Sequence, residues 1–323
     1  MSVDSLSASS SGIPGQKRPA AVWGYAAGII TGVTYGLNPL FAVPLIRQGI
    51  SVDTILLFRY LLAVVILGGW LAVRKENFRV SRKQVSRLVL LGLLFSMSSL
   101  TLFEAYNYIP SGVATTIVFL YPVLVAIIMV FMRVYPTWQV WLAIVMTFVG
   151  VLFLCRTDGN GMLHWRGLAL SFASALAYAM FIVIVNRSRT IRSVSNSLLT
   201  FYALLTGVCI FLVHGLVSQG GVSSLMKGLG HPSVWLNLTG LAVMPTVVST
   251  ATLAMATRII GATKASVLGV FEPVTAILVG AVAFGESITA NVIIGIAITM
   301  AAITFMIVSS SKGEKTKNEK VQN

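Results

Sequence analysis

The chain has 323 residues, of which 56% are hydrophobic and only 10% are charged, and its formal net charge is +14. A soluble domain carries about 25% charged residues, so this composition excludes an ordinary soluble fold and predicts a membrane protein. The basic residues stand in short segments between apolar runs, a pattern that indicates membrane loops rather than a nucleic-acid surface.

Ten segments are apolar and long enough to cross a membrane, for which a helix needs roughly 20 residues. In the first half they are Val22–Ile46, Thr54–Val73, Leu88–Tyr108, Val113–Met132 and Trp138–Cys155. In the second half they are Gly167–Val185, Ser197–Val217, Val234–Thr257, Ala265–Phe284 and Thr289–Val308. The runs are continuous and lack strict alternation, so we expect helices rather than a β-barrel. Residues 1–21 form a polar tail without signal-peptide features, and the first segment is therefore expected to be retained.

Lys and Arg residues are distributed unevenly between the two sides that ten spans create. One side holds most of the 23, in the two tails and in the segments 74–87 and 187–192. The other side holds Arg47, Arg156, Arg166 and Lys227. Because cytoplasmic loops carry an excess of Lys and Arg, we predict a multi-pass protein with both termini in the cytoplasm.

The sequence contains an internal repeat. Ala105–Leu124 resembles Ala256–Thr275, and five residues coincide at an offset of 151: Ala105/Ala256, Ile109/Ile260, Ala114/Ala265, Pro122/Pro273 and Val123/Val274. Landmarks in the second and seventh spans pair at an offset of 142: Leu56/Leu198, Leu57/Leu199, Tyr60/Tyr202 and Leu62/Leu204. We predict two five-helix repeats, 22–155 and 156–308, followed by a cytoplasmic tail at 309–323. Because five is odd, the two copies are expected to be inverted about an axis in the membrane plane, an arrangement typical of transporters.

The first span contains several helix-breaking residues. The stretch Tyr35-Gly36-Leu37-Asn38-Pro39, followed by Pro44, predicts a broken or bent helix. Irregular backbone at membrane depth is tolerated where it lines a cavity or is buried in protein. Asn38 is therefore a candidate binding residue, and the alternative is a simple proline kink that Asn38 caps.

Arg59 and Glu104 are two of three ionisable residues within apolar runs. Such a residue costs about 3 kcal/mol at the centre of a membrane helix, so it usually faces a partner or a cavity. Both lie toward the predicted outer side of their spans. We hypothesise that they pair or share a polar pocket, and the alternative is an ion pair that only holds two helices in register.

Glu272 is the third such residue, and Pro273 follows it directly. Proline frees a backbone carbonyl one turn earlier, so the carboxyl group stands beside unpaired polar backbone. The equivalent position in the first repeat is Tyr121-Pro122, which duplicates the break without the charge. Glu272 is a candidate substrate or proton site, and the alternative is a carboxyl group that hydrogen-bonds a neighbouring helix.

Tyr35, Tyr121 and Tyr178 are candidate substrate-stacking residues, although tyrosines in membrane helices also serve as packing or interface residues. Cys155 and Cys209 are interpreted as packing residues. We expect no catalytic residue, cofactor or metal.

These landmarks resemble those of the EamA-type transporters of the drug/metabolite transporter superfamily, across about residues 22–308. The strongest match is Ala256–Thr289, with Glu272-Pro273 at its centre, and Asn38-Pro39 and Phe58-Arg59-Tyr60 are similar to signatures of the first and second spans. The resemblance implies a ten-helix carrier of the cell inner membrane with a central cavity between inverted repeats. Members export amino acids, other metabolites or drugs, and some carry nucleotide sugars.

The expected function is secondary active transport, with export of a small metabolite such as an amino acid by alternating access. Arg59 is the only clear membrane-embedded cation, which favours a zwitterionic or neutral substrate over a phosphorylated sugar. No phosphate-binding loop for ATP is present, so protons are a candidate coupling ion and membrane lipid the surrounding partner. The alternatives are a flippase for lipid-type substrates, a channel or, on weaker grounds, an intramembrane enzyme, because His214 stands alone in its span.

Overall fold

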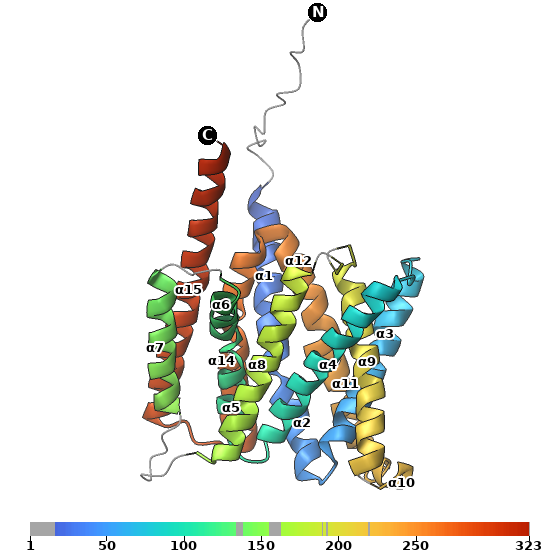
Figure 1. Cartoon of the computed structure of the whole chain (residues 1–323). Coiled ribbons are helices and arrows are strands. Elements are labelled where there is room, and N and C mark those ends of the chain that lie inside the picture. The colour runs from blue at the N-terminus through green and yellow to red at the C-terminus, as the bar shows by residue number, and fades with distance from the viewer. Residues whose placement is uncertain are drawn as a thin grey trace, which may run out of the picture.

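A computed structural model describes residues 17–133, 138–154, 163–188, 190–191, 193–218 and 220–322. Within these ranges the chain forms helices and no strand, and the helices lie side by side as a bundle (Figure 1).

The first half contains α1 (Lys17–Gly36), α2 (Asn38–Arg47), α3 (Val52–Val73), α4 (Arg82–Ala105), α5 (Ser111–Val118), α6 (Tyr121–Phe131) and α7 (Trp138–Leu154). The second half contains α8 (Trp165–Arg187), α9 (Asn196–Ser218), α10 (Val222–Leu225), α11 (Pro232–Ala242), the π-helical turn η1 (Val243–Val248), α12 (Ser249–Ile260), α13 (Ala262–Leu268), α14 (Phe271–Phe284) and α15 (Ala290–Gln322).

Nine helices or joined helix pairs of the described chain are long and apolar enough to cross a membrane. The shorter apolar helix α7, Trp138–Leu154, occupies the position of the fifth predicted span. The prediction of an all-helical, multi-pass membrane protein is therefore confirmed over the described residues. Cys155 lies outside them, and the other native cysteine, Cys209, is exposed on α9.

Several helix ends differ from the predicted span ends. Helix α4 begins at Arg82, six residues before the predicted third span, because Ser81 and Gln84 form a capping box that starts the helix early. Helix α1 begins at Lys17, inside the predicted tail 1–21, and residues 1–16 lie outside the described chain. Helix α15 continues to Gln322, so the predicted tail 309–323 is helical up to that residue.

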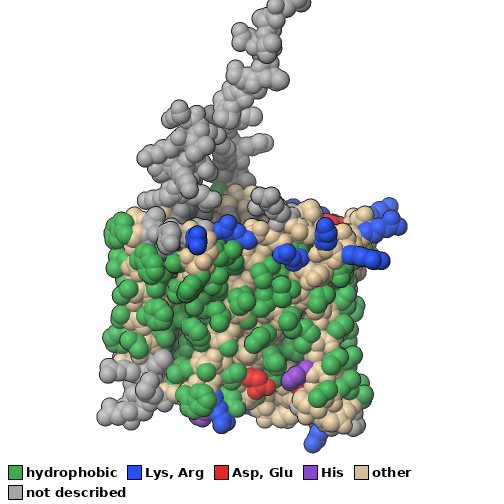
Figure 2. Space-filling model, viewed as in Figure 1, with side chains coloured by type: hydrophobic (Ala, Val, Ile, Leu, Met, Phe, Trp, Pro, Cys, Tyr) green, Lys and Arg blue, Asp and Glu red, His purple; other side chains and the backbone are tan. Residues whose placement is uncertain are grey.

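The two ends of the bundle differ in charge. Lys and Arg side chains gather along the upper edge of the face in Figure 2, whereas hydrophobic side chains cover the band below it. Helix α1 begins and α15 ends at the same upper end, where α3 also turns into α4 (Figure 1). We call this the basic end and the other the opposite end. The exposed hydrophobic band fits a bundle whose surrounding solvent is lipid.

Most long-range packing joins the first half of the chain to the second. Helix α3 packs on α9, α5 on α14, and α7 on α15. Helix α1 packs on α12. The corresponding helices of the other repeat are α8 and α4, and they also pack extensively against each other. The core therefore lies between the two repeats, and the same pattern of contacts appears twice.

Candidate functional site

Three spans are interrupted near the middle of the bundle, where the sequence places proline. The first span breaks at Leu37, between α1 and α2, and the fourth breaks at 119–120, between α5 and α6. The ninth breaks at 269–270, between α13 and α14. The predicted break in the first span is thus confirmed, and Pro39, Pro122 and Pro273 each stand at the second or third residue of the helix that follows a break.

Asn38 compensates for the hydrogen bond that Pro39 cannot make. Its Nδ2 donates to the carbonyl oxygen of Tyr35 at 2.8 Å, the acceptor that a residue with an N–H at position 39 would use in a regular helix. The side chain is 3% exposed, and its Oδ1 atom has no hydrogen-bond partner within the described chain. A buried acceptor without a partner is costly, so Oδ1 is available to a bound water or ligand.

Glu272 lies at the beginning of α14, directly after the break in the ninth span. Its backbone N–H donates to the carbonyl of Gly269 at 2.9 Å, the carbonyl that Pro273 leaves free. Among the described residues its carboxyl group has neither a hydrogen bond nor an ion pair, and the residue is half-buried. The group is therefore free to bind a ligand or a proton.

Helix α1 approaches Glu272 closely because two of its residues have no side chain. A Cβ atom at Gly36 would overlap the carbonyl oxygen of Glu272 and the side chain of Thr275. A Cβ atom at Gly32 would lie 2.9 Å from the carbonyl oxygen of Leu268. The glycines thus bring Tyr35 and the break of the first span against the break of the ninth.

Tyrosines surround this junction. The Tyr121 and Tyr178 rings meet edge to face, with centroids 4.8 Å apart. Tyr121 lies on α6 of the first repeat and Tyr178 on α8 of the second, and these two helices pack against each other. Glu272 lies close enough to Tyr35, Tyr121 and Tyr178 for electrostatic interaction with their hydroxyl groups. The structure therefore gathers four of the predicted site residues in one place.

Arg59 reaches the same group from α3. Its Nε donates to Thr246 Oγ1 at 3.1 Å, and its guanidinium carbon lies 5.4 Å from the centre of the Phe103 ring. Thr246 belongs to η1, where Pro245 interrupts the regular helix, and π-helical turns of this kind are frequent at functional sites. Arg59 is only 3% exposed, so the bundle holds this cation in a fixed position.

Arg59 and Glu272 share two tyrosine neighbours. Tyr35 and Tyr106 each lie within electrostatic reach of both the Arg59 guanidinium and the Glu272 carboxyl group. Tyr106 Oη also lies 3.2 Å from Thr115 Oγ1, which anchors its ring. The site therefore combines a positive group, a negative group and hydroxyl groups, a set of side chains suited to a zwitterion.

The expected pairing of Arg59 with Glu104 is not present: within the described chain no ion pair joins them. Glu104 accepts a hydrogen bond from Asn107 Nδ2 at 3.2 Å and lies within electrostatic reach of Asp53 and His214. The reason is geometric, because Glu104 stands one residue before the end of α4, at the opposite end of the bundle, whereas Arg59 is held by Thr246.

Four residues of this region were not singled out from the sequence. Thr246 and Tyr106 have no charge to mark them, and only the helix rotations bring them to Arg59. Asp53 was placed before the second span, and His214 was interpreted as alone, but Asp53 Oδ1 and His214 Nδ1 are 2.8 Å apart. The repeat offset of 142 residues does not mark this pair, because it relates Asp53 to Ser195 and His214 to Ala72.

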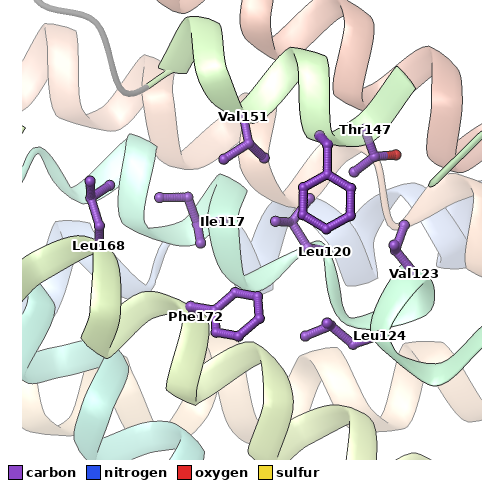
Figure 3. A pocket seen from close by; sticks show the side chains of 9 residues that line it. Ile117, Leu120, Val123, Leu124, Thr147, Val151, Leu168 and Phe172 are labelled. Carbon is purple, nitrogen blue, oxygen red and sulfur yellow. The ribbon is translucent and has the colours of Figure 1, made fainter. Parts of the chain in front are cut away.

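A separate cavity of about 160 Å³ lies between α5, α6, α7 and α8 (Figure 3). Eight of its nine lining side chains are apolar, and Thr147 is the exception. Such a lining suits hydrocarbon rather than a polar metabolite. Among the described residues, no group of three or more His, Cys, Asp or Glu side chains could hold a metal ion.

Comparison with known proteins gives consistent results. The model of the EamA-like transporter family matches residues 22–156 and 165–308. A protein named as an uncharacterized transporter from Synechocystis sp. is 23% identical over 256 residues, which cover 76% of this chain and 75% of that protein. An uncharacterized transporter from Archaeoglobus fulgidus is 29% identical over 137 residues, or 42% of this chain and 46% of its own. One crystal structure aligns with 93% of this chain and 100% of its own length, with a TM-score of 0.61 and 16% identity, and so shares the fold.

Proposed function

The chain belongs to the EamA-like transporter family, and on this premise we propose that it is a secondary active transporter that exports a small zwitterionic or neutral metabolite across the cell inner membrane. An amino acid is the simplest substrate of this kind. The proposal places the substrate among Tyr35, Tyr121, Tyr178 and Glu272, with Arg59 opposite.

The observation that carries the proposal is the pair of opposite charges, neither with an ion-pair partner in the described chain, that both lie within electrostatic reach of Tyr35 and Tyr106. The guanidinium group of Arg59 suits a carboxylate, because its fork of donors matches two oxygens. The free carboxyl group of Glu272 suits an ammonium group, and the tyrosine rings beside it add cation–π attraction. Both charged groups of an amino acid would then have partners, which offsets the cost of removing them from water.

Alternating access is supported by the repeated contacts between the two halves. Helices α1 and α8, which begin the two repeats, run in opposite directions along the bundle (Figure 1). Two inverted copies around one site can exchange which side is open by a rocking motion. The breaks in the fourth and ninth spans lie at equivalent positions and give each copy a hinge beside the site.

We propose protons as the coupling ion and Glu272 as the group that carries them. Carboxyl groups within membrane spans commonly serve as proton relays. Because Glu272 has no bonding partner in the described chain, a substrate ammonium group and a proton would compete for the same oxygens. Such competition couples an inward proton movement to outward substrate movement.

The experiment that tests this function begins with a thermal-shift screen of the purified protein against amino acids and related metabolites. A ligand that binds the folded state raises the apparent melting temperature. At a free ligand concentration of a hundred times the dissociation constant, it adds about 2.7 kcal/mol to the free energy of unfolding. The hit is then used in counterflow with proteoliposomes, where Glu272→Gln is expected to remove the dependence of net transport on a proton gradient. Transport that depends on the gradient equally in both proteins would remove Glu272 from the coupling.

A lipid-type substrate is the second candidate, because the apolar cavity of Figure 3 could accept hydrocarbon. The same screen distinguishes the two if it includes short-chain phospholipids. Stabilisation by lipids alone, without any metabolite hit, would favour a flippase over a metabolite exporter.

A further inference from the structure

Asp53, His214 and Ser218 form a cluster at the opposite end of the bundle, away from the candidate substrate site, in which Asp53 is buried and the other two residues are exposed. Asp53 Oδ1 lies 2.8 Å from His214 Nδ1, and Ser218 Oγ donates to Asp53 Oδ2 at 2.9 Å. Asp53 is 6% exposed. The cluster joins the beginning of α3, in the first repeat, to the end of α9, in the second.

The repeat gives this cluster a counterpart at the basic end. Adding the offset of 142 to Asp53 gives Ser195, and subtracting it from Ser218 gives Glu76. Ser195 Oγ donates to Glu76 Oε2 at 3.2 Å. A hydroxyl group and a carboxylate therefore connect the ends of α3 and α9 at both ends of the bundle. On the α3 side both groups are carboxylates, and on the α9 side both are hydroxyl groups.

The two bridges differ in the burial of the carboxylate and in the histidine. Glu76 is exposed whereas Asp53 is buried, and the partners His214, Ser218 and Ser195 are all exposed, so water competes more freely at Glu76. The residue equivalent to His214 is Ala72, which has no titratable group. Histidine is the side-chain type whose charge can change near neutral pH, and of the two bridges only the one at the opposite end contains a histidine.

We propose that Asp53, His214 and Ser218 form a proton-binding latch, which closes the opposite end of the α3–α9 pair when His214 is protonated and loosens it when His214 is neutral. The added positive charge attracts the Asp53 carboxylate. Proton binding on one side of the membrane thereby biases which end of the transporter opens. The gating role rests on the proposed alternating access, whereas the response to pH does not.

Other charged groups of the described chain lie around the latch. Glu104 on α4 lies within electrostatic reach of both Asp53 and His214. Helix α10 carries no acidic or basic residue, Lys227 just beyond it is exposed, and α9 carries none besides His214. Arg59 on α3 lies further along the helix and bonds Thr246. The carboxyl groups of Asp53 and Glu104 therefore both stand where they can attract a positive charge at the latch.

The test measures distances between spin labels in the full-length protein, reconstituted without substrate. In a background with both native cysteines replaced by serine, Gln48→Cys and Val217→Cys report on the opposite end. Val73→Cys and Asn196→Cys report on the basic end. All four positions are exposed.

For the opposite-end labels, the ratio of short to long distances is expected to fall about twofold to fivefold between about pH 5.5 and about pH 8.5. His214→Gln keeps a polar side chain without the titration and should abolish this change. The matched control His231→Gln should retain it, because His231 is exposed and caps nothing through its side chain.

An unchanged ratio in the wild type would overturn the latch, as would an equal change after His214→Gln or an equal change at the basic end. None of these results bears on whether the protein transports a metabolite, because no substrate is present. Conversely, a protein that transports none of the screened compounds can still show the pH response, which keeps the two failures distinct.

Discussion

Arg59 shows how a single residue is kept charged inside an apolar bundle. Its Nε hydrogen bond to Thr246 and its contact with the Phe103 ring fix the guanidinium group and leave its remaining N–H donors free of protein partners in the described chain. Its position within an apolar run made it visible in the sequence. Its partner was not, because the rotation of a helix about its axis cannot be read from composition.

At the same scale, we predict that Arg59→Lys weakens binding of the zwitterion identified by screening about tenfold to a hundredfold, the value of a buried hydrogen bond to a charged group. Lysine is a point charge and cannot both bond Thr246 and present a planar fork to a carboxylate. Arg47→Lys is the control, because Arg47 is exposed at the end of α2 and should change affinity less than about twofold. Isothermal titration measures both, and equal affinities in the two variants would remove Arg59 from the site.

The other candidate residues differ in how far the sequence could define them. Glu272 and Asn38 were recognisable because each stands beside a proline that frees a backbone carbonyl. Glu104 was recognisable as a charge within an apolar run, but its neighbours Asp53 and His214 were not, since they lie near the ends of such runs, where charges are ordinary. The roles of all these residues in transport stay predictions.

At the scale of elements, proline explains where the spans break, because it removes the bond from residue i to residue i−4. The breaks at Pro39, Pro122 and Pro273 could be located from the sequence on this basis. The π-helical turn at Val243–Val248 was not predicted. This turn also contains a proline, Pro245. A helix can accommodate a proline either by breaking or by widening one turn, and the local sequence does not distinguish these two outcomes.

The contact between α1 and α14 gives a prediction for Gly36→Ala. The added methyl group would overlap the carbonyl oxygen of Glu272, so we expect a loss of about 1–3 kcal/mol in stability and a lower melting temperature in detergent. Gly69→Ala in α3 is the matched control, because a Cβ atom there has nothing within 4 Å and alanine favours the helix. A melting temperature that Gly36→Ala leaves unchanged, or lowers no more than the control does, would contradict the close approach of α1 and α14.

At the scale of the whole molecule, composition and apolar run length were sufficient to predict an all-helical membrane protein, because lipid permits few other solutions. The two-repeat organisation was also visible, through residues that recur at offsets of 142 and 151. What the sequence could not define is the pairing of helices between the halves. That pairing depends on side-chain packing along several helices at once, and it decides which residues share a site.

We propose that one interior site faces each side of the membrane in turn, and Thr275→Cys tests this proposal most directly. Thr275 is half-buried, packs against Gly36 and lies one turn beyond Glu272. In a background without native cysteines, a membrane-impermeant maleimide is applied to right-side-out and inside-out vesicles. If the site alternates, we expect labelling from both sides, with substrate or a proton gradient raising one rate while lowering the other. Labelling from a single side under every condition would contradict it.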